Sequence, residues 1–281
     1  MNEVNINIIE NFPTLPTVYS AILSKIQDNK TTAKDISDLL ILDQASTFKL
    51  LSLVNSSIFS FKKKITTISE AVTFLGFNEV RDTILTLAVM NMMKLYRTNK
   101  NFNIIELWKH SIFVGIFSKI VAKNLNLANY EELFIAGILH DIGKLALYNS
   151  YQNTYVDLIK FSNENNSSLI IEEKKKFSLN HSEVGALLAK KWNLSKVITD
   201  TIEYHHSKNI EQHENSSAIA CIYLANQSAN LIWNFNTASD IIEKPSNSIW
   251  EILNIKKGFF NKIKDEILNT YEDSLNILKI N

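Results

Sequence analysis

The side chains in this sequence with the most obvious capacity for chemistry are its histidines and the acidic residues beside them. Glu106 and His110 are four residues apart, so on a helix they share one face. His140 and Asp141 are adjacent at the end of an apolar segment. A buried imidazole and carboxylate side by side need a partner, and a divalent cation is a good one. Lys144 follows one turn later, where it can lie near a bound anion.

Three more histidines fall where helices are expected to begin or end. His181 lies in the first turn of one expected helix, and His205 and His206 lie at the end of another. Adjacent helical side chains point about 100° apart, so one of these two rings can face solvent. Together with Glu106, His110, His140 and Asp141, these positions predict a site for a divalent metal.

Each residue also has an ordinary structural interpretation. A lone helical histidine is usually a packed or surface residue, and the macrodipole alone favours histidine near a helix C-terminus. Glu106 and His110 can form a simple helix pair. Only the joint arrangement favours a metal, so ligation and plain burial both stay open.

Other chemistries have little support. The chain contains no G-x-G-x-x-G, phosphate-binding loop, H-E-x-x-H, C-x-x-C or G-x-S-x-G motif. Its one cysteine, Cys221, lies in an apolar stretch and is predicted to be a small core residue.

The composition predicts that helices position these residues. The chain has 6 glycines and 3 prolines, whereas average usage would give roughly 20 and roughly 14 for this length. Sheet proteins need many tight turns, which use both residues. With 46% hydrophobic residues the chain can bury a large core. We therefore expect an all-α fold whose helices are joined by polar loops.

Periodicity and capping signals place helices in the N-terminal part. One is expected from Leu15-Pro16 and one from Thr31 or Thr32. The other expected features are Asp43 as the N-cap of a helix with Phe48, Leu51 and Val54 inward, a capping box from Thr67 to Glu70 in a helix stopped by Gly76, and Asn78 as the N-cap of a helix towards Tyr96.

A polar segment at 97–104 precedes a second group of expected helices. Helices are expected over about 106–125, from 130 into His140-Asp141, over about 151–165, from a capping box at Asn180 and Glu183 to Trp192, from a cap at Ser195 to about His206, over 216–233, over 250–255 and over 259–280.

Charge and hydropathy restrict the partners. The 29 basic and 29 acidic residues give a formal net charge of zero, which argues against nucleic acid. The lysine runs at 62–64 and 174–176 are expected to be solvated loops or helix ends. The N-terminus lacks the basic and apolar regions of a secretion signal, and no apolar run is long enough for a membrane span. We therefore expect a cytoplasmic protein with no membrane partner.

The segment from Ile138 to Lys144, ILHDIGK, resembles the HD superfamily of metal-dependent phosphohydrolases. The N-terminal segments narrow the resemblance. Four of these segments resemble the HDOD domain, which is the HD-related output domain of bacterial signalling proteins. They are Leu15-Pro16, Leu39 to Asp43, Val54 to Ser57, and Ile68 to Arg81.

The resemblance covers residues 8–210 and implies an all-α HD-superfamily bundle. An N-terminal lobe of about 8–96 would pack on an HD-like lobe of about 105–210, and an extension of 216–281 would complete or pack on the latter. HDOD modules are generally regarded as lacking established catalytic activity. The implied role is a non-catalytic, regulatory module in bacterial signal transduction that acts through a signalling protein partner.

The related HD-GYP phosphodiesterases imply a residue set for the site. Their catalytic lysine position matches Lys144, and their final metal-binding aspartate falls at Asn226. No Gly-Tyr-Pro loop follows His206, which argues against hydrolysis of a cyclic dinucleotide. The implied ligands of a divalent metal (Fe, Mn, Zn, Ni or Mg) are Glu106, His110, His140, Asp141, His181, His205 and His206.

Two alternatives stay open beside the non-catalytic module. In a metal-dependent phosphohydrolase or phosphodiesterase, Asp141 and the histidines would hold the metal and Lys144 would stabilise phosphate charge. The weaker alternative is nucleic-acid binding through the lysine runs. The sequence does not predict the oligomeric state.

Overall fold

The chain forms two compact units in a computed structural model that describes residues 8–10, 12, 21, 22, 25, 31–41, 44–56, 58, 59, 63–93, 96, 98, 100–128, 130–233 and 245–278. The first unit comprises 1–13 and 96–267, and the second comprises 14–95 and 268–281. The described residues contain helices and no strand, which confirms the all-α prediction. Within the same residues, no helix combines the length and apolar character needed to cross a membrane.

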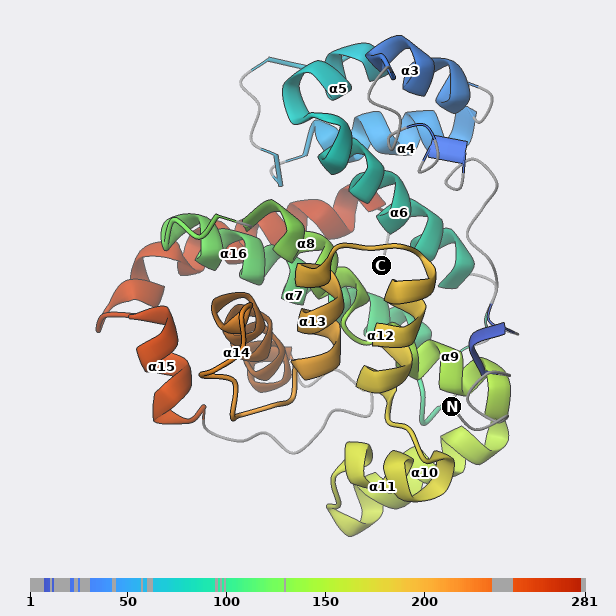
Figure 1. Ribbon diagram of the computed structural model, residues 1–281, viewed down its shortest axis with the longest axis vertical. Coiled ribbons are helices and arrows are strands. Elements are labelled where there is room, and N and C mark those ends of the chain that lie inside the picture. The colour runs from blue at the N-terminus through green and yellow to red at the C-terminus, as the bar shows by residue number, and fades with distance from the viewer. Residues whose placement is uncertain are drawn as a thin grey trace. The chain divides into compact units, whose positions relative to one another are not determined.

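The first unit is built from helices of 7 to 21 residues (Figure 1). In chain order they are α7 (Ile104–Asn124), α8 (Tyr130–Leu139), α9 (Ile142–Tyr151), α10 (Asn153–Asn165), α11 (Leu169–Phe177), α12 (His181–Lys191), α13 (Lys196–Tyr204), α14 (Ser216–Trp233) and α15 (Asn247–Leu253). The second unit holds α3 (Ala33–Ile41), α4 (Gln44–Val54), α5 (Ile68–Leu75) and α6 (Phe77–Met93). Helix α16 (Phe259–Leu278) begins in the first unit and ends in the second.

The predicted caps determine where several helices start. Thr67 and Glu70 form the expected capping box of α5, and Asn180 and Glu183 form that of α12. The Ser195 hydroxyl accepts a hydrogen bond from the backbone N–H of Ile198 at the start of α13. These interactions span three residues, so the local sequence is enough to specify them.

Two local predictions need correction, and two helices were missed. Asn78 is not an N-cap, because α6 already begins at Phe77. Phe48 does not face inward: its side chain is 73% exposed, since α4 buries the face that carries Leu50, Leu53 and Val54. The sequence analysis did not identify helices α9 (Ile142–Tyr151) and α11 (Leu169–Phe177). The predictions at Leu15-Pro16 and Asp43 lie outside the described residues.

Helix α7 is the centre of the first unit and packs most extensively on α8 (Figure 1). Its residues from Leu107 to Ala122 are almost all buried. The two helices approach closely at Gly115 and Gly137, where a Cβ on Gly137 would overlap the backbone of Gly115 and Val114. Glycine at both positions therefore permits the contact that brings the end of α8 beside α7.

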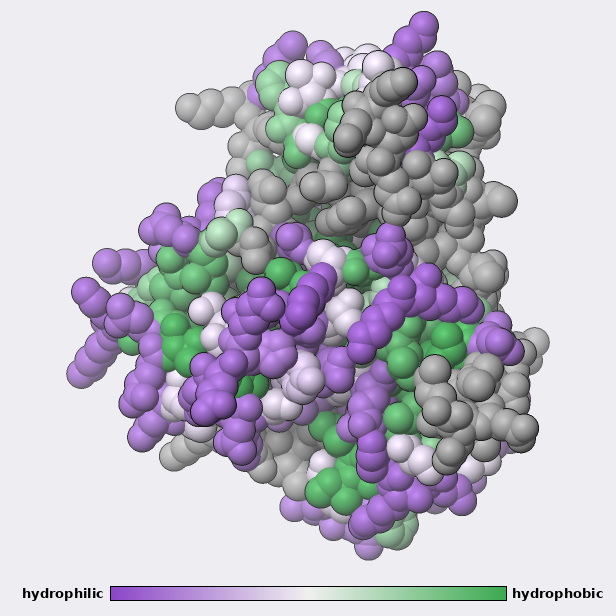
Figure 2. Space-filling model, viewed as in Figure 1, coloured by the Kyte–Doolittle hydropathy of each residue, from purple (hydrophilic) through white to green (hydrophobic). Residues whose placement is uncertain are grey.

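A second close contact joins α9 to α12. A Cβ on Gly143 would overlap the carbonyl oxygen of His181, and one on Gly185 would lie 2.8 Å from the Cγ2 of Ile202 on α13. Helices α12 and α13 also pack on each other. Their outer faces are covered largely by hydrophilic side chains in Figure 2, in keeping with one buried and one solvated face. The inner ends of α7, α8, α9, α12 and α13 thus meet.

Replacing Gly137 by alanine is expected to destabilise the first unit, because the added methyl group collides with main-chain atoms that cannot rotate away. Overpacking of this kind costs about 1–3 kcal/mol or more. Chemical denaturation of the variant should show a lower unfolding midpoint. Lys123→Ala, at an exposed position of α7, is the control and should unfold near wild type. An unchanged midpoint for Gly137→Ala would contradict the close approach.

Candidate metal centre

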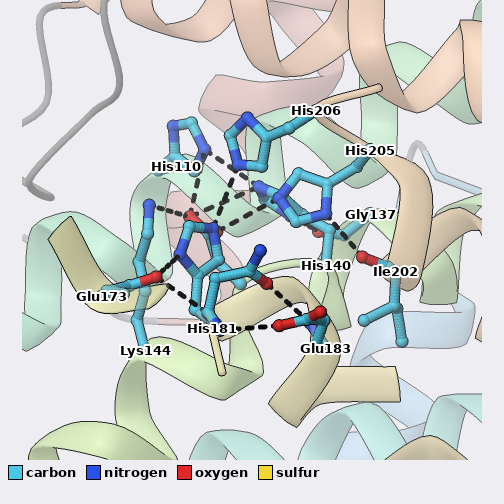
Figure 3. A network of polar contacts seen from close by, with 12 residues as sticks. His110, Gly137, His140, Lys144, Glu173, His181, Glu183, Ile202, His205 and His206 are labelled. Atoms are coloured by element: carbon cyan, nitrogen blue, oxygen red, sulfur yellow. Dashed lines mark hydrogen bonds and ion pairs between the residues drawn. The ribbon is translucent and has the colours of Figure 1, made fainter. Parts of the chain in front are cut away.

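Helix α7 and the ends of α8, α9, α12 and α13 bring most of the sequence-predicted ligands together within the first unit. His110 lies on α7, and His140 and Asp141 occupy the junction between α8 and α9. His181 is the first residue of α12, while His205 is the C-cap of α13, followed by His206. Figure 3 shows the five imidazoles gathered in one place.

These side chains are removed from solvent. The exposed fraction is 1% for His110 and Asp141 and 0% for His140, His181 and His205. His206 is half-buried, so the two adjacent histidines differ in exposure as the sequence had suggested. The centre is closed on almost every side.

The two carboxylate oxygens of Asp141 face different histidines. Asp141 Oδ2 lies 3.4 Å from His140 Nε2 and 3.8 Å from His110 Nε2. Asp141 Oδ1 lies 3.3 Å from His181 Nε2 and 3.6 Å from His205 Nε2. Two sets of potential metal ligands result, which we name the His110 group (His110, His140 and Asp141) and the His181 group (Asp141, His181, His205 and His206).

Hydrogen bonds on the far side of three rings determine which nitrogen faces the centre. His140 Nδ1 lies 2.7 Å from the carbonyl oxygen of Gly137, and His205 Nδ1 lies 2.7 Å from that of Ile202. A carbonyl oxygen only accepts, so each Nδ1 carries the proton and each neutral ring presents an Nε2 lone pair. His181 is held in the same way, through Nδ1 and a carboxylate oxygen of Glu173 at 2.7 Å. This is the usual arrangement around a metal-ligating histidine.

The distances between ligand atoms fit a metal ion. Two imidazole nitrogens bound to one ion at about 2.1 Å are roughly 3.0–3.4 Å apart. His181 Nε2 and His206 Nε2 are separated by 3.0 Å, and His110 Nε2 and His140 Nε2 by 3.2 Å. In the His181 group, Asp141 Oδ1 and His205 Nε2 are buried and make no hydrogen bond. Buried polar atoms without such a partner are costly, and a cation would satisfy both.

Lys144 occupies the other side of Asp141. Its Nζ lies 2.8 Å from Asp141 Oδ2, and both side chains are buried. Burial acts to raise the pKa of Asp141, but Lys144 and the nearby imidazoles hold it well below its ordinary value. Asp141 is therefore an anion, with Oδ2 bound to Lys144 and Oδ1 facing the His181 group.

Two of the sequence-predicted positions have different surroundings. Glu106 lies on the same helix as His110, but its carboxylate is 3.5 Å from Lys109 and it belongs to neither group of ligand atoms. Asn226, on α14, is buried, and its side chain interacts with His110.

The sequence analysis missed Glu173. This residue of α11 is fully buried, and its carboxylate accepts hydrogen bonds from the His181 ring and from Tyr155. Leu169, Glu173 and Phe177 are four residues apart and are all buried. The one signal in the sequence that could have indicated Glu173 is its position as an acidic residue between Leu169 and Phe177 on the buried face of a helix.

Burial favours the neutral form of most of the histidines. It lowers the pKa of His110 to about 4, lowers the pKa of His205, and lowers those of His140 and His206 well below the ordinary value. Burial also acts to lower the pKa of His181, but the Glu173 carboxylate outweighs it and the pKa is raised. Near neutral pH, burial therefore keeps His110, His140, His205 and His206 neutral, whereas the Glu173 carboxylate favours protonation of His181.

Metal-free protein is expected to lose stability as the pH falls from about 7 to about 5. The unfolded chain then takes up protons on histidines that the folded chain keeps neutral, and for His110 alone the loss is roughly 2 kcal/mol. His181 acts in the opposite direction, because its pKa is raised. Denaturation across this pH range in the presence of a chelator measures the loss. His110→Gln should reduce the pH dependence, and a slope equal to that of wild type would contradict the assignment.

Most of the chain is similar in sequence and in fold to known HDOD domain proteins. Residues 12–208 match the sequence profile of the HDOD domain. An HDOD domain protein of unknown function from Geobacter sulfurreducens has the same fold, with a TM-score of 0.73 and 24% identity over 98% of this chain and 97% of that one.

Two curated proteins are also similar. An uncharacterized protein of Treponema pallidum (strain Nichols) is 26% identical over 80% of this chain and 43% of its own length. Ribonuclease Y of Mycoplasma mycoides is 29% identical over 62% of this chain and 36% of its own length. The chain thus spans less than half the length of these relatives. With the HDOD match extending over more than half of its residues and including the His140-Asp141 junction, the chain belongs to the HDOD domain family.

Proposed function

We propose that this chain is a non-catalytic signalling module that holds one divalent metal ion in the His181 group and acts through a protein partner. The observation that carries the proposal is that the His181 group offers four ligand atoms, from Asp141, His181, His205 and His206, enough to fill a tetrahedral ion. In structural metal sites protein ligands fill all four positions, whereas catalytic sites keep one open for water or substrate. Membership of the HDOD family supports the signalling role.

The His181 group is the better of the two sets for a metal. It offers four ligands, and its carboxylate oxygen, Asp141 Oδ1, has no hydrogen bond. In the His110 group the corresponding oxygen already faces the ammonium of Lys144, which would repel a second cation. Asn226 brings a neutral amide to His110, so no further negative charge compensates there.

The chemistry of the ligands favours some ions over others. Three imidazoles and one carboxylate suit Fe, Ni or Zn, whereas Mg prefers oxygen ligands. Mn, which tolerates both kinds of ligand, is less favoured by a set in which nitrogen predominates. In this role the ion would tie α12, α13 and the α8–α9 junction together.

A second candidate function is metal-dependent phosphoester hydrolysis. Lys144 is the observation that favours it, because a buried ammonium beside the ligands can stabilise phosphate charge. A bound divalent ion supplies Lewis-acid chemistry in such reactions. The similarity to a protein named as a ribonuclease makes RNA a substrate to test beside small phosphoesters.

Elemental analysis of the purified protein is expected to find about one divalent metal ion per chain. Removing it with a chelator should lower the melting temperature, because an ion that binds only the folded state stabilises that state. His205→Ala should abolish the bound metal, whereas His213→Ala, the control outside the group, should retain it. Metal-free wild-type protein that cannot be reconstituted would contradict the proposal.

Metal-loaded protein is expected to leave simple phosphomonoesters, phosphodiesters, cyclic dinucleotides and RNA unhydrolysed. Turnover would support the second candidate if Lys144→Met lowered it by a factor of ten or more while keeping the metal, since the substitution removes the charge and retains similar bulk. Release of phosphate or of cleaved product is measured directly. Activity that survives in Lys144→Met and His205→Ala comes from a contaminant.

A further inference from the structure

We infer that Glu173 is a positioning residue for the metal centre: its carboxylate holds the His181 ring in the orientation, and with the proton on Nδ1, that a ligand in the His181 group requires. The inference rests on the proposed metal function. It adds to the metal centre one residue and one helix that provide none of the ligand atoms. Glu173 lies on α11, which contributes to neither ligand group.

The contacts of Glu173 are directed at His181. Its Oε2 accepts hydrogen bonds from the backbone N–H of His181 at 2.8 Å and from the ring Nδ1 at 2.7 Å. Figure 3 shows Glu173 beside the His181 ring. With Nδ1 protonated, Nε2 is left to face Asp141 Oδ1 at 3.3 Å and His206 Nε2 at 3.0 Å. A carboxylate in this place also makes the imidazole a stronger ligand.

His181 differs from the other two rings whose orientation is fixed by an Nδ1 contact. His140 and His205 each bond to a carbonyl oxygen three residues earlier in their own segment, at Gly137 and Ile202. His181 bonds instead to a side chain from another helix, eight residues away. Its ring can therefore be set only when α11 is docked against the start of α12.

Helices α10 and α11, which we call the α10–α11 hairpin, pack on each other and position the Glu173 carboxylate beside His181. Tyr155, fully buried on α10, donates its hydroxyl hydrogen bond to Glu173 Oε1 at 2.7 Å. Its ring lies 6.2 Å from that of Phe177 at the end of α11. Burying an ionised carboxylate is costly unless donors satisfy it. Here the donors are Tyr155 and the metal-facing histidine, so the hairpin and the centre are coupled through one side chain.

A purely structural role predicts something different. The bond from the His181 backbone N–H helps to start α12, and such a bond requires an acceptor oxygen but no charge. A glutamine at 173 has the same shape: its oxygen can accept both bonds from His181 and its amide can donate to the Tyr155 oxygen. Glu173→Gln thus removes the charge and retains the hydrogen bonds.

Binding of Co²⁺ by the full-length chain tests the inference. Glu173→Gln is expected to lower Co²⁺ affinity about 10–100-fold in competition with a chelator. It should also shift the visible absorption bands of the bound ion, because the strength and orientation of one ligand change. The melting temperature of the metal-free variant should stay close to that of wild type.

Glu172→Gln is the matched control. It makes the same chemical change one residue earlier on α11, where the side chain pairs with the exposed Lys175 at 2.9 Å, and it should bind Co²⁺ as wild type does. Affinity and spectrum equal to wild type in Glu173→Gln would overturn this inference alone. Failure of wild type itself to bind Co²⁺ would overturn the proposed metal function and the inference with it. If Glu173→Gln does not fold, Tyr155→Phe should weaken Co²⁺ binding several-fold, and an unchanged affinity there overturns the inference.

Discussion

The buried Asp141 carboxylate is the constraint on which the first unit depends. An ionised group with 1% exposure is tolerated only where opposite charge and hydrogen-bond donors surround it. The Lys144 ammonium lies 2.8 Å from one carboxylate oxygen of Asp141. The imidazole nitrogens of His110, His181 and His205 face the carboxylate from α7, α12 and the end of α13. The helix ends must therefore converge on this point, and the packing of the unit has to allow it.

The segment from Ile138 to Lys144, ILHDIGK, contains several residues that help to accommodate the buried Asp141 carboxylate. His140 directly follows α8 and its ring bonds back to the carbonyl oxygen of Gly137, and Asp141 occupies the N-cap position of α9. Gly143 leaves room for the carbonyl oxygen of His181, so α12 can come within reach of Asp141. Lys144 is one turn further along α9 and returns to Asp141.

The centre combines features of an enzyme and of a structural site. The ligand types, the protonated Nδ1 positions and the ligand spacings suit a divalent ion. Closure, the ammonium at Asp141 Oδ2 and the amide of Asn226 in place of a carboxylate argue for holding an ion without turnover. In the proposed function, the ion would fix the positions of α12, α13 and the α8–α9 junction.

Local signals in the sequence determined most of the helices, though not α9 or α11, and the caps at Thr67, Asn180 and Ser195, because capping and amphipathic spacing act over three or four residues. The motifs around His140-Asp141 and in the N-terminal segments indicated the family. The same signals indicated the histidines and Asp141. They could not place Phe48 on the exposed face of α4, show that Glu106 lies outside both groups of potential ligands, or find Glu173. Those outcomes depend on contacts between helices: the His110–His140 pair joins residues 30 apart and the His181–His206 pair residues 25 apart. Only the tertiary structure brings such residues within hydrogen-bonding distance, and it alone decided how the two oxygens of Asp141 are shared.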